Sequence, residues 1–127
     1  MPQSEERFDT FCPRVLIVDD DLDLMEAIAD WLESRCGARV TSCCSAEEAM
    51  VATTPESFDV FVLDYRLDGA DGVTLGAMLR EINPNARLIL LSGDLSAKVE
   101  TSALEHGFGR VFSKPVAPEI LFDAIAH

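Results

Sequence analysis

Short apolar runs alternate along the chain with longer segments in which apolar residues recur every three or four positions. The short runs are rich in valine, isoleucine, leucine and phenylalanine, a composition typical of β-strands. They span residues 14–18, 38–44, 58–63, 86–92 and 109–113. Helical periodicity lies between them, near residues 21–35, 45–54, 72–82 and 95–106, and from about residue 117 to the end. Five strands alternating with five helices predict an α/β fold, a doubly wound parallel sheet with helices on both faces.

The residues at the ends of these segments agree with this assignment. Gly37 and Gly107 stand where a helix C-terminus favours a left-handed residue. Ser45 and Glu48 have the spacing of a capping box, in which each side chain accepts a backbone N–H of the first helical turn. Asn83 precedes a proline, which cannot continue a helix. These signals mark helix ends without using hydrophobic periodicity.

Polar side chains that could bind a ligand or take part in a reaction follow four of the five predicted strands. They are Asp19, Asp20 and Asp21 after the first strand, Asp64 after the third, Ser92 at the end of the fourth and Lys114 after the fifth. The second strand ends in two cysteines and a serine, without a charge. The strand order 2-1-3-4-5 fits this distribution, because it places the second strand at an edge and the other four side by side. In such a sheet, ligands bind at the carboxyl ends of the strands.

The aspartates after the first strand are too crowded to be explained by solvation alone. Two carboxylates about 4 Å apart repel by about 4 kcal/mol at an effective dielectric constant near 20. Asp21 is expected to cap the following helix. Asp19, Asp20 and Asp64 would then form an oxygen-only pocket, which suits a hard divalent cation such as Mg²⁺, with Mn²⁺ as the alternative.

A cation at this pocket would allow a phosphoryl group to approach. Lys114 would offset the charge of the phosphoryl oxygens and Ser92 would donate a hydrogen bond to them. Asp64 stands alone on its strand end, so it is the carboxylate expected to attack phosphorus and become an acyl phosphate.

Composition narrows the classes of protein to which the chain can belong. Its 127 residues are 48% hydrophobic and 26% charged, as in a globular protein of one domain. The net charge of -13, from 10 basic and 23 acidic residues, opposes contact with nucleic acid or an anionic membrane. The four cysteines lack the spacing of a metal site or a disulfide framework. With neither a membrane-spanning stretch nor a signal peptide visible, we expect a cytoplasmic location and no membrane insertion.

Four motifs together resemble the receiver domain of two-component response regulators, similar to chemotaxis regulators. They are LIVDD, FVLDYRLDGADG, LILLSGD and VFSKP, and the resemblance covers residues 14–127. Residues 1–13 would be a tail or linker. The resemblance implies a flavodoxin-like fold and transfer of a phosphoryl group to Asp64 from a histidine kinase or histidine phosphotransfer protein. It also implies a signalling switch that catalyses its own phosphorylation and dephosphorylation, and a homodimer through the fourth helix, fifth strand and last helix.

The resemblance also assigns roles to individual residues. The metal would be held by Asp19, Asp20, Asp64 and the backbone carbonyl of Arg66, while Lys114 and Ser92 assist the transfer. The bond between Lys114 and Pro115 is expected to be cis, an uncommon but established geometry for a bond to proline.

One departure from the family and one pair of charged residues bear on how phosphorylation would be read out and how long it would last. Val111 stands where many family members carry an aromatic residue three positions before the lysine, and Phe112 should face the other side of the strand. The switch would then rest on Ser92 and Val111 without a swinging ring. Arg66 and Asp94 occupy positions that in the family flank the path of water to the phosphoryl group, so an ion pair between them would lengthen its lifetime.

The first predicted helix carries more apolar side chains than core packing requires. One stripe consists of Leu24, Ile28, Trp31 and Leu32, and a sideways extension consists of Leu22, Met25 and Ala29. The extension is either a partner surface, as in the family, or a sign of deeper burial.

Three other functions fit parts of the sequence. A degenerate receiver would act only as a protein interaction module. A haloacid dehalogenase-like phosphotransferase would use DDDLD as its nucleophile motif but would leave Asp64 unexplained. A flavin protein would need a phosphate-binding loop after the first strand. A stand-alone regulator, a fragment of a larger regulator and the terminal module of a hybrid kinase all stay open.

Overall fold

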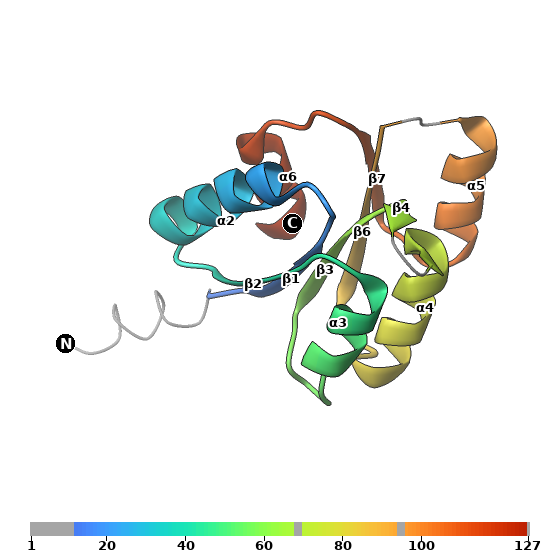
Figure 1. Cartoon of the computed structure of the whole chain (residues 1–127), viewed down its shortest axis with the longest axis horizontal. Helices are drawn as coiled ribbons and strands as arrows, with labels where there is room; N and C mark the ends of the chain where they lie inside the picture. The colour runs from blue at the N-terminus through green and yellow to red at the C-terminus, as the bar shows by residue number, and fades with distance from the viewer. Residues whose placement is uncertain (1–11, 68–69, 94–95, 127) are drawn as a thin grey trace.

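The computed structural model contains a five-stranded parallel sheet with helices on both faces (Figure 1). The structure describes residues 12–67, 70–93 and 96–126. The strands are β1 (Arg14–Val18), β2 (Arg39–Cys43), β3 (Val60–Asp64), β6 (Arg87–Ser92) and β7 (Arg110–Ser113). They lie in the order β2-β1-β3-β6-β7, which confirms the predicted order 2-1-3-4-5.

Helices cover both faces of the sheet, with a different set on each (Figure 1). One set is α2 (Leu22–Cys36) and α6 (Pro118–Ala126), and the opposite set is α3 (Ala46–Ala52), α4 (Gly72–Ile82) and α5 (Ala97–Glu105). In the part of the chain that the structure describes, these helices are too short or too polar to cross a lipid bilayer.

A small two-stranded antiparallel ladder follows β3 and was not predicted. It pairs β4 (Arg66–Leu67) with β5 (Ala70–Asp71). Strands of two residues carry no alternating apolar pattern, so hydrophobic periodicity could not reveal them. The ladder lies between the end of β3 and the start of α4, beside the carboxyl edge of the sheet.

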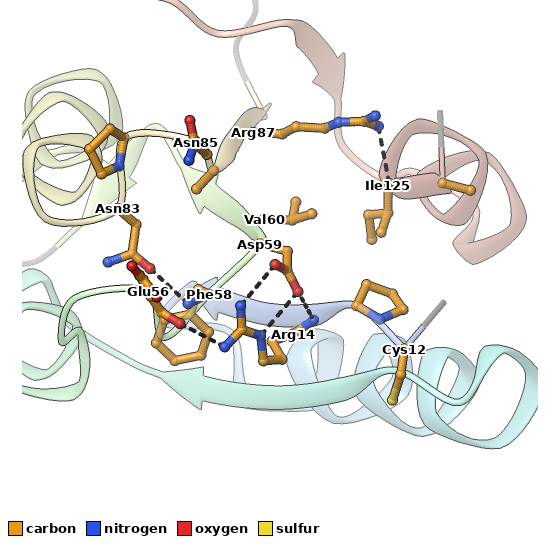
Figure 2. A pocket seen from close by; sticks show the side chains of 14 residues that line it. Cys12, Arg14, Glu56, Phe58, Asp59, Val60, Asn83, Asn85, Arg87 and Ile125 are labelled. Atoms are coloured by element: carbon orange, nitrogen blue, oxygen red, sulfur yellow. Dashed lines mark hydrogen bonds and ion pairs between the residues drawn. The ribbon is translucent and has the colours of Figure 1, made fainter. Parts of the chain in front are cut away.

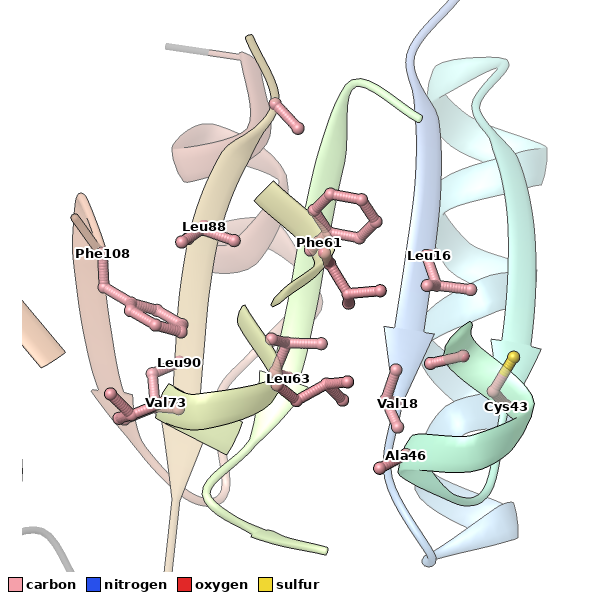
Figure 3. Packing of buried hydrophobic residues seen from close by; sticks show 14 of the residues in the cluster. Leu16, Val18, Cys43, Ala46, Phe61, Leu63, Val73, Leu88, Leu90 and Phe108 are labelled. Carbon is pink, nitrogen blue, oxygen red and sulfur yellow. The ribbon is translucent and has the colours of Figure 1, made fainter. Parts of the chain in front are cut away.

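The sheet divides the hydrophobic core into two clusters. Successive side chains of a strand point to opposite faces, so Leu16 and Val18 of β1 enter one cluster while Val15 and Ile17 enter the other. Figure 3 shows the first cluster, in which side chains of β1, β3 and β6 pack against α3 and α4. All five residues of β3 are buried, because this central strand is covered on both faces.

The helix ends agree with the sequence analysis except for one hydrogen bond. Asp21 caps α2 by accepting the Leu24 N–H at 3.1 Å, and Ser45 caps α3 by accepting the Glu48 N–H at 3.1 Å. A capping box would direct the Glu48 carboxylate to the Ser45 N–H. It instead accepts the N–H of Cys44, one residue earlier, at 2.8 Å. Glu48 thereby reaches the outer edge of the sheet.

Of the two interpretations of the apolar extension, a partner surface is wrong for Met25 and deeper burial is confirmed. Met25 is only 3% exposed and packs in the core with Ile28 and Leu32. The stripe that faces the sheet runs along these three residues and leaves Leu22, which is 64% exposed, at the start of the helix.

Candidate functional site

The carboxyl ends of β1 and β3 bring three carboxylates together. Carboxylate oxygens of Asp19, Asp20 and Asp64 all lie within 4.8 Å of one another. β1 and β3 are neighbouring strands, and Val18 lies opposite Leu63. The next residues, Asp19 and Asp64, therefore lie side by side at the carboxyl edge of the sheet. Asp19 and Asp64 are buried and Asp20 is exposed. The structure therefore forms the acidic pocket that the strand-end pattern predicts.

Lys114 reaches two of these carboxylates from the turn after β7. Its Nζ lies 3.0 Å from Asp19 Oδ2 and 3.2 Å from Asp64 Oδ2. The Lys114 backbone N–H donates to the Ser92 carbonyl at 2.8 Å, which anchors the turn to the end of β6. The Lys114–Pro115 bond is cis, as the resemblance implies.

Burial and neighbouring charges shift the protonation of this group. Burial raises the pKa of Asp64, and the Asp19 carboxylate raises it further, while the Lys114 ammonium opposes both effects. Burial alone would lower the pKa of Lys114, but the Asp19 and Asp64 carboxylates together raise it above its usual value. Lys114 therefore carries a positive charge at neutral pH.

The charge balance of the pocket fits a divalent cation. Three carboxylates and one ammonium leave an excess of two negative charges when all are ionised. Within the described residues, Asp19 Oδ2 is buried and accepts no hydrogen bond of good geometry, although the Lys114 ammonium lies 3.0 Å away. A pocket with only oxygen donors suits Mg²⁺ or a similar hard cation.

Backbone contacts fix the position of Asp64. The next residue, Tyr65, donates its N–H to the Leu91 carbonyl at 2.8 Å and accepts the Gly72 N–H at 2.7 Å. A Cβ atom on Gly72 would lie 2.3 Å from the Asp64 carbonyl oxygen, so only glycine fits at the start of α4. The backbone N–H of Arg66 hydrogen bonds to the Asp64 carboxylate.

Sequence reasoning did not identify the positioning role of Gly72. The available signal in the sequence was the dipeptide Asp71-Gly72, at the end of the loop between β3 and α4. A glycine at a helix start has many explanations, and only the short distance to the Asp64 backbone selects this one.

Ser92 ends β6, the strand next to β3, and Val111 lies on β7, the strand beyond β6. Asp64 pairs with Leu91 in the sheet, so Ser92 follows the residue that neighbours the acidic pocket. Ser92 is buried. Val111 packs against the first core cluster and Phe112 against the second, so these side chains face opposite sides of β7, as expected.

Arg66 is exposed on β4, close in sequence to Asp64. Asp94 lies outside the described residues, so the predicted pairing of Arg66 with Asp94 is a prediction still to be tested. A hollow with a volume of about 540 Å³ borders the pocket and is lined by Asp20, Leu22, Cys44, Arg66 and Leu67.

A second hollow, of about 640 Å³, lies at the opposite edge of the sheet (Figure 2). Arg14, Asp59 and Arg87, three of its charged residues, are engaged with neighbours. Arg14 Nη2 lies 3.0 Å from Asp59 Oδ1, and Arg87 Nη1 donates to the Ile125 carbonyl at 3.2 Å. The first contact joins the amino ends of β1 and β3 and the second ties the start of β6 to α6, both away from the acidic pocket.

A parallel sheet with an aspartate cluster and a lysine at its carboxyl edge defines the receiver class of signalling domain. The family model described as "Response regulator receiver domain" matches residues 15–126, and the chain belongs to this family. Receiver domains bind a divalent cation at an acidic pocket, and response regulators interact with histidine kinases. Membership excludes the haloacid dehalogenase-like and flavin-binding alternatives.

Curated and solved proteins agree with this assignment. The C4-dicarboxylate transport transcriptional regulatory protein DctD of Rhizobium meliloti is 30% identical over 86% of this chain, which spans 24% of that protein. The CheY-like receiver domain protein of Methanospirillum hungatei has a TM-score of 0.84 and 27% identity, over 91% of each chain.

A Burkholderia pseudomallei response regulator, solved with a phosphorylated aspartic acid, calcium ion and citrate, has a TM-score of 0.82 and 27% identity. That match covers 89% of this chain and 66% of the other.

Proposed function

We propose that Asp64 accepts a phosphoryl group from the phosphohistidine of a histidine kinase or histidine phosphotransfer protein. A carboxylate oxygen of Asp64 attacks phosphorus, the bond between phosphorus and the imidazole nitrogen breaks, and the imidazole leaves with the bonding electrons. The observation that carries this proposal is the placement of Asp64 within 4.8 Å of two further carboxylates and 3.2 Å from Lys114. The phosphorylated aspartic acid in the similar Burkholderia pseudomallei protein supports it.

The surrounding residues then take the following roles. Asp19, Asp20, Asp64 and the Arg66 carbonyl would hold Mg²⁺, or Mn²⁺ in its place. The cation supplies positive charge that offsets the carboxylates and the phosphoryl oxygens. Lys114 exchanges a carboxylate contact for a phosphoryl oxygen and keeps its charge throughout.

The transfer would change a protein surface through Ser92 and Val111. The Ser92 hydroxyl donates a hydrogen bond to the phosphoryl group. Val111 lies opposite Leu90 on the neighbouring strand, so movement at the end of β6 reaches β7 through adjacent residues. The face formed by α5, β7 and α6 is the surface on which a homodimer would form. An ion pair between Arg66 and Asp94 would slow hydrolysis by hindering the approach of water.

The described domain is one part of a larger signalling pathway. The chain spans about a quarter of the length of the first curated relatives that it matches. We assign residues 14–127 to the receiver domain and residues 1–13 to a tail or linker. We expect a cytoplasmic location, and the acidic charge of the domain opposes direct contact with nucleic acid.

The experiment uses acetyl phosphate as a small donor, with intact mass and hydroxylamine sensitivity as readouts. The wild-type chain should gain one labile phosphoryl group in Mg²⁺ and lose this gain in a chelator. Asp64→Asn should gain none, whereas Asp30→Asn, an exposed residue of α2, should behave as wild type. A wild-type chain that stays unmodified at every Mg²⁺ concentration would instead identify a degenerate receiver.

A further inference from the structure

The strand β2 forms one edge of the sheet, and its hydrogen bonds show which of its backbone groups face outward. The Arg39 N–H donates to the Pro13 carbonyl at 2.9 Å, and the Cys43 carbonyl accepts the Asp19 N–H at 3.1 Å. The odd-numbered residues of β2 therefore bond toward β1. In a parallel ladder the N–H and C=O of one residue point the same way, so the even-numbered residues face the open edge.

Two of the outward N–H groups are covered by glutamates from neighbouring helices. The Val40 N–H donates to Glu33 Oε2 of α2 at 3.3 Å. The Cys44 N–H donates to Glu48 Oε1 of α3 at 2.8 Å, and the Cys44 thiol donates to the same oxygen at 3.2 Å. These bonds from Cys44 hold the pKa of Glu48 below its usual value, so the carboxylate is ionised at neutral pH. Two different helices thus each supply an acceptor to one strand edge.

The spacing of the two covered groups matches a self-complementary strand pair. In an antiparallel pair centred on Ser42, Ser42 lies opposite its own copy and Val40 lies opposite Cys44 of the other chain. Outward-facing residues form the hydrogen-bonded pairs, and each pair exchanges two N–H···O bonds. The glutamates occupy the donors of both outer pairs in each copy. They therefore remove the bonds that would flank the centre of such a dimer.

The rest of the edge has few of the features that prevent strand pairing. Charged side chains, prolines and bulges are common protections of exposed edges. Within β2, Arg39 is the charged residue at the first position, and the following residues are Val40, Thr41, Ser42 and Cys43. Thr41 and Ser42 are both exposed. The protection on either side of Ser42 rests on the two carboxylates.

We propose that the β2 edge is a strand-pairing surface for a second copy of this chain, and that Glu33 and Glu48 keep it closed. The surface lies at the opposite end of the sheet from β7. Pairing there is therefore separate from a dimer through α5, β7 and α6.

The test removes both acceptors and measures the mass of the protein in solution. Glu33→Ala with Glu48→Ala should double the mass in sedimentation velocity as concentration rises, with chelator present and no phosphodonor. Glu26→Ala with Glu47→Ala removes two exposed glutamates from the same helices, so this matched control has an equal charge and should stay monomeric. A double variant that stays monomeric while folded, as judged by circular dichroism, would overturn the proposal.

Two further variants address the contacts themselves. Adding Ser42→Lys to the double alanine variant places like charges opposite each other at the centre of the pair and should restore the monomer. A dimer that survives this change would rule out pairing centred on Ser42. The single variant Glu33→Ala opens one donor and should dimerise more weakly than the double. If the double variant does not fold, a strictly monomeric Glu33→Ala protein would equally contradict the proposal.

Discussion

At the scale of single residues, Asp20 adds the exposed carboxylate to a pocket that already holds two others. Asp20→Asn removes like-charge repulsion, so in chelator it should raise the free energy of unfolding by about 1 kcal/mol, a value reduced by solvent screening. The variant should lose most of the stabilisation that Mg²⁺ gives the wild-type chain. Urea unfolding at several Mg²⁺ concentrations measures both effects.

Asp21→Asn is the matched control for this experiment. Asp21 caps α2, and asparagine caps helices about as well as aspartate. Its Mg²⁺ response should therefore stay close to that of the wild type. An Asp20→Asn protein with an undiminished Mg²⁺ response would exclude Asp20 from the cation site.

The residues of the pocket could be predicted because strand ends determine their position. Asp19 follows β1, Asp64 ends β3 and Lys114 follows β7, and a parallel sheet gathers such residues at one edge. Gly72 could not be assigned in the same way. Its importance lies in the close approach of its backbone to Asp64, where any side chain would place a Cβ 2.3 Å from the Asp64 carbonyl oxygen. Sequence spacing does not encode that contact.

At the scale of elements, the start of α2 presents an exposed apolar residue beside the pocket. Leu22 is 64% exposed and lines the hollow next to Asp20. Leu22→Glu should slow transfer from the phosphorylated partner about 10-fold, equivalent to about 1.4 kcal/mol, and leave acetyl phosphate labelling unchanged. Leu104→Glu alters a residue of α5 that is 54% exposed and should leave both rates unchanged. Equal loss of both rates in Leu22→Glu would indicate damage to the fold instead.

Helix α2 also shows where periodicity stops being informative. The apolar positions of its sequence permit two stripes that share Ile28, one through Leu24 and Trp31 and the other through Met25 and Leu32. The centres of the two stripes differ by a rotation of roughly 65° around the helix axis, less than the roughly 100° between successive residues. The packing of the sheet and α6 buries Met25, Ile28 and Leu32 and leaves Leu24 and Trp31 partly buried, so periodicity predicted the helix and part of its buried face.

At the scale of the whole molecule, an ion pair at the edge remote from the pocket should govern part of the acid sensitivity. The side-chain hydrogen bond from Arg14 is the largest cause that lowers the pKa of Asp59 below its ordinary value of 3.8. A carboxylate with a lowered pKa stabilises the folded state at pH values above 3.8. This contribution is lost as the pH falls through the pKa of the folded state. Asp59→Asn should therefore lower the free energy of unfolding at pH 7 by about 1 kcal/mol, a modest value because both side chains are nearly half exposed.

Urea unfolding in chelator at pH 7 and pH 3 measures this contribution. The difference between wild type and Asp59→Asn should shrink at pH 3, which lies below the ordinary value of 3.8. A difference that is the same at both pH values would mean that the Arg14 contact does not act through charge.

The two core clusters lie on opposite faces of one sheet, with the strand backbones between them. Substitutions that share no neighbours have additive effects on stability. A cavity at Leu63 in one cluster and a cavity at Ile89 in the other therefore perturb separate sets of side chains. The layer beneath α3, α4 and α5 can accumulate changes over evolution without requiring compensation beneath α2 and α6. One domain thus offers selection two cores that can be repacked separately.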